Sequence, residues 1–319
     1  MKIKSYTVIF LTLVLLMSVP VHGEEIGNGA AVLKMIPSAK GTALGNSLAA
    51  DNSFDAVFYN PAGIATIALF ENIGVGMSYS SISKQSLMQS AFLGYYELKN
   101  VGVFGLSVLY NDNGDIPLVT LNEDESVTDT GTSFGAMDMA GRLAYARTFL
   151  EGRLLTGISF SFVYSKIESY SATGYGADIG IQYLNLIQDL VIGLSVKNLG
   201  TGLKYISKTS DFPLTVNFGL KYIFIDATLI PDHYLAAYLQ GDMVLNEKTN
   251  GFSAGLEYGF MKVIYLRAGY RAEKDNLFSF SFGAGFKYQF LKLKPELDIS
   301  FLPQSDFGNK LYVNLMVNF

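Results

Sequence analysis

The feature of this sequence that most limits its fold is an alternation of oily side chains with small or polar ones. In the stretch 278–288 the even positions are aromatic except for one alanine, while the odd positions hold serine, glycine or lysine. The stretches 214–222 and 158–165 repeat the pattern. Because successive side chains of a strand point to opposite faces, each stretch predicts a β-strand with one apolar face. A soluble β-sandwich produces the same alternation, so no single strand decides the fold class.

The number of alternating segments decides it. Fourteen segments carry the pattern, and their lengths match the roughly 9–11 residues that a tilted strand needs to cross a bilayer. An even strand number suits a closed barrel, and closure leaves no unpaired strand edge in lipid. The sequence therefore predicts an all-β fold over 70–319, a closed antiparallel transmembrane β-barrel. The expected strands are 70–80, 87–97, 101–111, 136–147, 153–165, 174–184, 189–199, 213–225, 233–244, 250–260, 262–271, 276–288, 294–302 and 310–319.

Composition favours a barrel over a bundle of membrane helices. Half of the residues are hydrophobic, yet after residue 23 no apolar run approaches the roughly 20 residues of a spanning helix. The chain has 20 tyrosines, 23 phenylalanines and 32 glycines, but only 8 prolines. Aromatic side chains suit the girdles at the two membrane interfaces, and glycine suits a crowded lumen.

The first 23 residues have the pattern of a secretory signal peptide. Lys2 and Lys4 precede an apolar stretch from Val8 to Val19, and Gly23 offers a small residue for cleavage. Cleavage would take two lysines from totals of 23 basic and 28 acidic side chains, leaving a formal charge of −7. That balance provides no basic surface for nucleic acid. The absence of cysteine excludes disulfides, thiolate metal sites and a lipoprotein anchor.

The ends of the barrel and its connections indicate an orientation. The last strand alternates up to Phe319, and such a strand with a final phenylalanine resembles the assembly signal of bacterial outer-membrane proteins. Short connections alternate with longer ones, of which 112–135 is the longest. Because short turns of such barrels lie in the periplasm, both termini are expected there. The predicted location is the bacterial outer membrane, with lipid and the outer-membrane assembly machinery as partners.

The segment 24–69 does not alternate and is expected to form a plug. Small residues crowd it, and the run Asn60, Pro61, Ala62 and Gly63 is typical of a turn. Its glycine spacing is not a nucleotide-binding motif, because no strand leads into it. The positions from Ala39 to Gly63 resemble the N-terminal hatch of the FadL superfamily, with the PorV/PorQ-like branch as the nearest. The resemblance implies a fourteen-stranded barrel with this hatch in its lumen. That branch usually has a second glycine and an aromatic residue after Leu-Gly, whereas Asn46-Ser47-Leu48 follows here.

Residues that could support catalysis are scarce, and no cofactor or metal is expected. Outside the signal-like segment the one histidine is His233, predicted in or beside a turn next to Asp232. A turn histidine is more often solvated than catalytic. The run Gly251–Gly255 matches the Gly-x-Ser-x-Gly pattern of a nucleophile elbow, but it lies within an alternating strand with no helix after it. An enzyme is therefore not expected.

Charged residues on the polar face of the strands are expected to line the lumen, since charge on the lipid face is costly. One interpretation is a salt-bridge network that holds the hatch, and the other is a selectivity lining for a polar solute. Glu257 and Arg267 should lie opposite each other or one pair apart across a tight turn near 261–262. The predicted lumen charges are Asp138, Arg142, Asp178, Lys197, Lys221, Asp242, Glu257, Arg267, Arg271, Lys287 and Asp298.

Three functions remain open at this stage. The first is uptake of small, hydrophobic molecules across the outer membrane, as the resemblance to FadL implies. The longest connection, Asp112 to Phe134, is rich in acidic residues and makes a poor trap for fatty acids. The second is a protein-interaction role in secretion, like that of PorV in type IX secretion, with secreted proteins as partners. The third is a mainly structural barrel. Fold alone does not choose among them.

Overall fold

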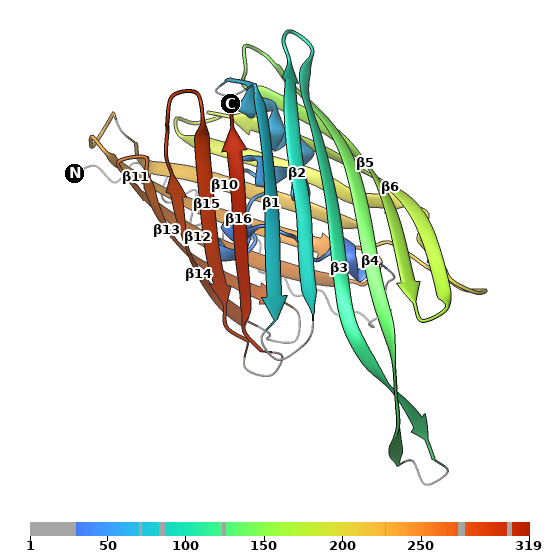
Figure 1. The fold of residues 1–319 in the computed structure, drawn as a ribbon. Helices are drawn as coiled ribbons and strands as arrows, with labels where there is room; N and C mark the ends of the chain where they lie inside the picture. Colours follow the sequence, from blue (N-terminus) through green and yellow to red (C-terminus); the bar gives the residue numbers. More distant parts are fainter. Residues whose placement is uncertain are drawn as a thin grey trace.

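Within the described residues of this computed structural model, fourteen strands close into one antiparallel barrel. The structure describes residues 30–69, 72–82, 87–122, 126–226, 228–273, 278–304 and 308–319, so the predicted signal peptide lies outside them. Each barrel strand pairs with the next barrel strand along the chain, and β1 closes the barrel against β16 (Figure 1). The barrel strands are β1 (Ile73–Ile82), β2 (Met88–Leu98), β3 (Gly102–Leu121), β4 (Val127–Phe149), β5 (Leu154–Ile167), β6 (Tyr170–Leu184), β7 (Leu190–Gly200), β10 (Thr215–Ile225), β11 (His233–Val244), β12 (Thr249–Phe260), β13 (Ile264–Glu273), β14 (Phe278–Lys287), β15 (Lys294–Leu302) and β16 (Lys310–Asn318).

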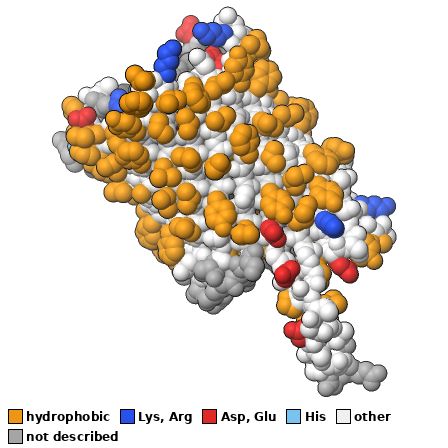
Figure 2. Space-filling model, viewed as in Figure 1, with side chains coloured by type: hydrophobic (Ala, Val, Ile, Leu, Met, Phe, Trp, Pro, Cys, Tyr) orange, Lys and Arg blue, Asp and Glu red, His pale blue; other side chains and the backbone are white. Residues whose placement is uncertain are grey.

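The alternation of the sequence becomes the two faces of the barrel wall. On β14, Phe280, Phe282 and Phe286 are about half exposed and face outward, whereas Ser281 faces inward and is buried. The outward side chains form the apolar surface of Figure 2, and the charged residues in that view lie toward the ends of the barrel. This surface matches the hydrocarbon core of a bilayer, so the barrel is a transmembrane one.

Two ends of the barrel can be told apart. The hairpin of β3 and β4 projects far beyond one end, here named the hairpin end (Figure 1). The C-terminus lies at the opposite end, here named the C-terminal end. Tight turns at Asn100, Glu151 and Met261, all with positive φ, join strands at the C-terminal end.

The longest connection differs from its sequence-based prediction. The segment 112–135 is expected to be a loop, but β3 and β4 stay paired as far as Leu121↔Val127. Register shifts near Asp112 and Pro117 interrupt the ladder without ending it. Beyond the membrane both faces of this ribbon meet water, so its strands need no oily face and leave no amphipathic signal. Between β7 and β10 the chain adds a small separate sheet of β8 (Leu203–Lys204) and β9 (Thr209–Ser210).

The N-terminal segment fills the lumen. It consists of the short helices η1 (Ala31–Leu33), α2 (Ala39–Ala43), η2 (Phe54–Phe58) and η3 (Pro61–Leu69), which lie inside the strands in Figure 1. Among the residues that the structure describes, no helix has the length and apolar character to cross a membrane. Residues 39–50 are buried almost throughout, as expected for a plug surrounded by the wall. We call residues 30–69 the hatch from here on.

Candidate functional site: the seated hatch and its two cavities

The Asn60 turn fixes the hatch to the wall. The Asn60 amide nitrogen donates to the carbonyl oxygens of Ala49 in the hatch, at 2.9 Å, and of Ile181 on β6, at 3.0 Å. Its amide oxygen accepts from the backbone nitrogen of Ala62 at 3.1 Å, an Asx-turn contact that Pro61 supports with its fixed φ. A further bond from the amide nitrogen reaches the Leu194 carbonyl of β7 at 3.4 Å. Asn60 is fully buried, and all four bonds would be lost without its side chain.

Polar wall residues complete this attachment. Gln182 on β6 donates to the backbone oxygens of Ala49 and Asp51, and Gln240 on β11 accepts from the backbone nitrogen of Ala49. Two further donors, Ser195 on β7 and Asn217 on β10, bond the Tyr59 carbonyl at 2.7 and 3.1 Å. Because buried backbone groups are costly to leave unpaired, these side chains specify where the hatch sits. The sequence analysis did not single them out, although each occupies an inward position of an alternating strand.

Asp51 is the electrostatic centre of the hatch. Its carboxylate accepts from Lys40 of α2 at 2.8 Å and from Lys221 of β10 at 3.0 Å, and it is fully buried. Burial alone would raise the pKa of the Asp51 carboxyl, but the two ammonium groups outweigh burial and hold that pKa well below its usual range. One hatch residue is thereby tied both to the hatch helix and to the barrel wall.

A belt of wall glycines makes room for the hatch backbone. A side chain placed at Gly180 of β6 would overlap Asn60, and one at Gly269 of β13 would overlap the backbone of Gly45. At Gly180 the obstacle is the buried side chain of Asn60, whereas at Gly269 it is hatch backbone, which cannot yield without moving the hatch as a whole. The other members of this glycine belt are Gly157, Gly193, Gly219, Gly255 and Gly283, which all face hatch residues in the same way.

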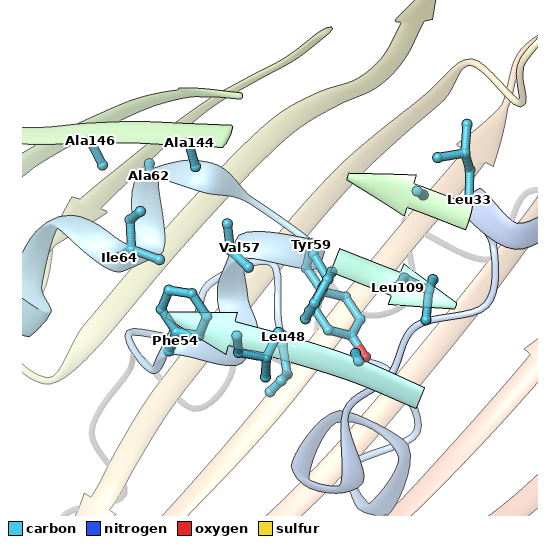
Figure 3. Close-up of a cluster of buried hydrophobic side chains, with 14 of the residues drawn as sticks. Leu33, Leu48, Phe54, Val57, Tyr59, Ala62, Ile64, Leu109, Ala144 and Ala146 are labelled. Atoms are coloured by element: carbon cyan, nitrogen blue, oxygen red, sulfur yellow. The ribbon is translucent and has the colours of Figure 1, made fainter. Parts of the chain in front are cut away.

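Apolar packing holds the other side of the hatch. Val57 and Ile64 of the hatch belong to one buried cluster with Ala144 and Ala146 of β4 (Figure 3). The Phe54 ring lies 5.4 Å from the ring of Tyr95 on β2. These contacts remove apolar hatch side chains from water, which stabilises the seated position.

The predicted lumen charges lie on the inward face, and most pair with one another along the wall. Arg142 meets Asp178 at 3.3 Å and also lies over the Phe58 ring of the hatch. Arg271 bonds Asp242 at 2.9 Å, and Asp138 accepts from Ser165. Lys287 pairs with Glu296 at 2.6 Å. The remaining members are also buried or half-buried: Lys197, Lys221, Glu257, Arg267 and Asp298.

Arg267 joins two carboxylates. The register pairs Glu257 with Arg267 directly, which is one of the two pairings that the sequence allows, and their side chains meet at 2.6 Å. Arg267 also bonds Asp298 of β15 at 2.5 Å. Tyr238 donates to Glu257 at 3.1 Å, which links this trio to the groups around Asp51. The second carboxylate was not foreseen, because a sequence pattern pairs neighbouring strands but not strands two apart.

The hatch separates two cavities on the same side of the lumen. A cavity of about 450 Å³, the hairpin-end cavity, lies among α2, β1, β2 and β13–β16 toward the hairpin end. A cavity of about 620 Å³, the C-terminal cavity, lies among the hatch, β1, β2 and β13–β16 toward the other end. Thr42 and Tyr312 line the first, whereas Lys40 and Asn314 line the second. These residues are neighbours on α2 and on β16, so α2 is the narrow barrier between the two cavities.

Two positions considered for catalysis have structural surroundings. The His233 Nδ1 atom lies 2.8 Å from the Tyr258 hydroxyl at the C-terminal end of the barrel. In the Gly251–Gly255 run, Ser253 accepts from Arg271, and Gly255 lies against Leu44 of the hatch. Ser253 lies within β12 and therefore lacks the strand-to-helix elbow that a serine nucleophile of this pattern needs. No group of three or more potential metal ligands occurs among the described residues.

Comparisons with known proteins agree with this architecture. No protein-family model matches the sequence, and no curated protein matches it. Solved structures do match. The toluene transporter TbuX of Ralstonia pickettii has a TM-score of 0.61 at 13% identity, covering 87% of this chain and 96% of its own. The toluene transporter TodX of P. putida has a TM-score of 0.61 at 14% identity, covering 88% and 97%. A Pseudomonas aeruginosa FadL homologue has a TM-score of 0.53 at 12% identity, covering 93% and 99%. At these identities the likeness establishes the fold alone, a closed β-barrel like those of these three proteins.

Proposed function

We propose that this protein is an outer-membrane channel for the uptake of small, largely hydrophobic molecules, and that the hatch is its closed gate. The observation that carries the proposal is the position of α2 between two cavities on one side of the lumen. A barrel with only a structural role has no need for a cavity on each side of a thin internal barrier. The toluene transporters with the same fold support the substrate class by analogy alone.

The orientation of the channel follows from the proposed location. With the hairpin end outside the cell, a solute enters the hairpin-end cavity, passes α2 and reaches the C-terminal cavity on the periplasmic side. That cavity mixes ion pairs with apolar side chains such as Phe54, Ile67 and Leu93. The apolar part of this lining suits the passage of a poorly hydrated molecule.

Deletion of residues 24–64 tests the gate. Because this deletion removes α2, the Asn60 turn and Asp51, we expect single-channel conductance in planar bilayers to rise several-fold over that of the full-length barrel. Heat-modifiable migration on gels must persist, which shows that the deleted form still closes. Unchanged conductance from a correctly closed barrel would contradict the proposal.

One observation favours a second candidate, a protein-interaction role of the PorV type. The β3–β4 hairpin extends far beyond the barrel and exposes Leu118, Val119 and Val127 together with acidic residues (Figure 1). A partner-binding role needs this exposed ribbon but no open pore. Conductance at background level with and without the hatch would therefore favour the second candidate.

A further inference from the structure

Part of the lining of the hairpin-end cavity is apolar. Its volume of about 450 Å³ falls within the roughly 300–1,000 Å³ of small-molecule sites. Met35 and Ile36 of the hatch, Ile82 of β1, and Leu302 and Pro303 at the end of β15 line one part of it. Such a lining binds an apolar body by removing its surface from water.

Other residues of the same lining carry hydroxyl and amide groups. Ser281 is the most informative, because it is 2% exposed and its Oγ has no hydrogen-bond partner among the described residues. Tyr312, Thr42 and Gln89 line the same cavity. A buried hydroxyl without a partner is destabilising, so a ligand that bonds it gains affinity.

The charges around the cavity cancel. Lys34, Arg271 and Lys310 line it, as does the carboxylate of Glu273. Lys34 is paired with Glu247, and Arg271 is paired with both Asp242 and Glu273. Lys310 has no ion pair among the described residues. When the partners outside the lining are counted, three cations and three carboxylates surround the cavity, so their formal charges sum to zero.

We propose that the hairpin-end cavity is a binding site for a small neutral amphiphile, an apolar body that carries one hydroxyl group. The inference rests on the proposed uptake role and narrows its substrate class. A pure hydrocarbon leaves the Ser281 hydroxyl unpaired. An ion gains little from surrounding charges that sum to zero, and a polyol leaves the apolar side chains against polar surface.

Four fluorinated probes with one shared ring separate these classes. The probes are 4-fluorotoluene, 4-fluorobenzyl alcohol, 4-fluorobenzoate and 4-fluorobenzylammonium, and xylitol serves as a polyol competitor. Binding to the full-length barrel in lipid nanodiscs is measured by ¹⁹F NMR, with empty nanodiscs to correct for partition into lipid. We expect the alcohol to bind roughly three- to tenfold more tightly than the hydrocarbon, as one hydrogen bond implies. Both ions should bind more weakly than the alcohol, and xylitol should not displace it.

A matched pair of variants assigns the site. Ser281→Ala should weaken binding of the alcohol roughly three- to tenfold and leave binding of the hydrocarbon unchanged. Ser300→Ala is the control, because Ser300 on β15 is equally buried and also lacks a partner among the described residues, but it does not line the cavity. Equal losses in both variants, or tighter binding of the hydrocarbon, an ion or the polyol, would overturn the inference.

Uptake by whole cells distinguishes failure of this site from failure of the channel proposal. The full-length barrel is expressed in a Gram-negative host with an intact outer membrane, and uptake of radiolabelled benzyl alcohol and toluene is followed. Uptake without selective binding of the alcohol would overturn the assigned site and leave the channel role in place. Selective binding without uptake would support the site and count against the channel role.

Discussion

At the scale of single residues, Arg267 is expected to contribute more to the stability of the barrel than either of its two carboxylate partners. It compensates Glu257 and Asp298 together, at 2.6 and 2.5 Å, and its side chain is almost fully buried. Glu257→Gln leaves Arg267 with Asp298, so we expect a loss of about 1–3 kcal/mol. Arg267→Gln strands two buried carboxylates, so we expect about 3–5 kcal/mol or more. Urea unfolding of the folded barrel, followed by heat-modifiable migration, measures both.

The double variant tests whether the two carboxylates act together. If Glu257 and Arg267 formed an isolated pair, Arg267→Gln would partly restore the stability lost in Glu257→Gln. Because Asp298 then lacks a cation, we expect no restoration until Asp298→Asn is added. If Glu257→Gln combined with Arg267→Gln regained stability without Asp298→Asn, Asp298 would not depend on Arg267 for its charge compensation.

The sequence predicts some residue positions and not others, for a physical reason. Alternation assigns a side chain to a face, and a tight turn sets the pairing of Glu257 with Arg267. Contacts between the hatch and the wall, such as Lys221 with Asp51, depend on how the closed barrel surrounds the segment. Asn46 is an intermediate case. It departs from the pattern of the PorV/PorQ-like branch, yet asparagine is among the residues that tolerate its positive φ of 66° just after α2.

At the scale of elements, the glycine belt explains why several strands carry inward glycines. Gly269→Ala would drive a methyl group into the backbone of Gly45 and Leu44. We expect it to weaken hatch seating by about 1–3 kcal/mol, the usual cost of overpacking. Limited proteolysis of the hatch in the folded barrel measures the change.

Gly141→Ala is the matched control for this substitution. Gly141 lies on β4, and a Cβ added there meets nothing within 4 Å. We expect its proteolysis rate to equal that of the unmodified protein. Equal protection in the two variants would mean that the wall glycines are not what seats the hatch.

Strand positions were the most predictable elements, and the hairpin was the least. Membrane strands must hide one face in lipid and the other in the lumen, and this requirement leaves a period-two pattern. The ribbon beyond Asp112 has no such requirement, so its pairing was not foreseen. The small β8–β9 sheet, with its buried Leu203, is similarly too short to leave a pattern.

At the scale of the whole molecule, one buried carboxyl group beside the C-terminal cavity lacks an ion pair among the described residues. Lys40 and Lys221 pair with Asp51, Arg267 pairs with Glu257 and Asp298, and Lys287 pairs with Glu296. Asp55 on η2 lines the same cavity, but its side chain accepts a hydrogen bond from the amide of Asn314, at 3.3 Å, rather than pairing with a cation. Burial, and after it the repulsion of Asp298, raises the pKa of Asp55 to about 6.

The Asp55 carboxyl, which lacks an ion pair in the described part of the chain, gives hatch seating a pH dependence of definite sign. In a displaced hatch the Asp55 carboxyl returns toward its ordinary pKa of 3.8, so the seated hatch binds this proton more tightly. Seating is therefore strongest below pH 4, weakens as pH rises through 6 and levels off above it. The difference between the two pKa values corresponds to roughly 3 kcal/mol of seating free energy.

Conductance in planar bilayers between pH 4.5 and 7.5 measures this dependence. We expect the open fraction of the full-length channel to rise with pH, and the rise to be largest near pH 6. Asp55→Asn keeps the hydrogen bond from Asn314 but cannot ionise, so its open fraction should stay low and flat across the range. Asp129→Asn, on the exposed hairpin, should keep the full pH response. An Asp55→Asn channel that still opens with rising pH would show that another group controls the gate.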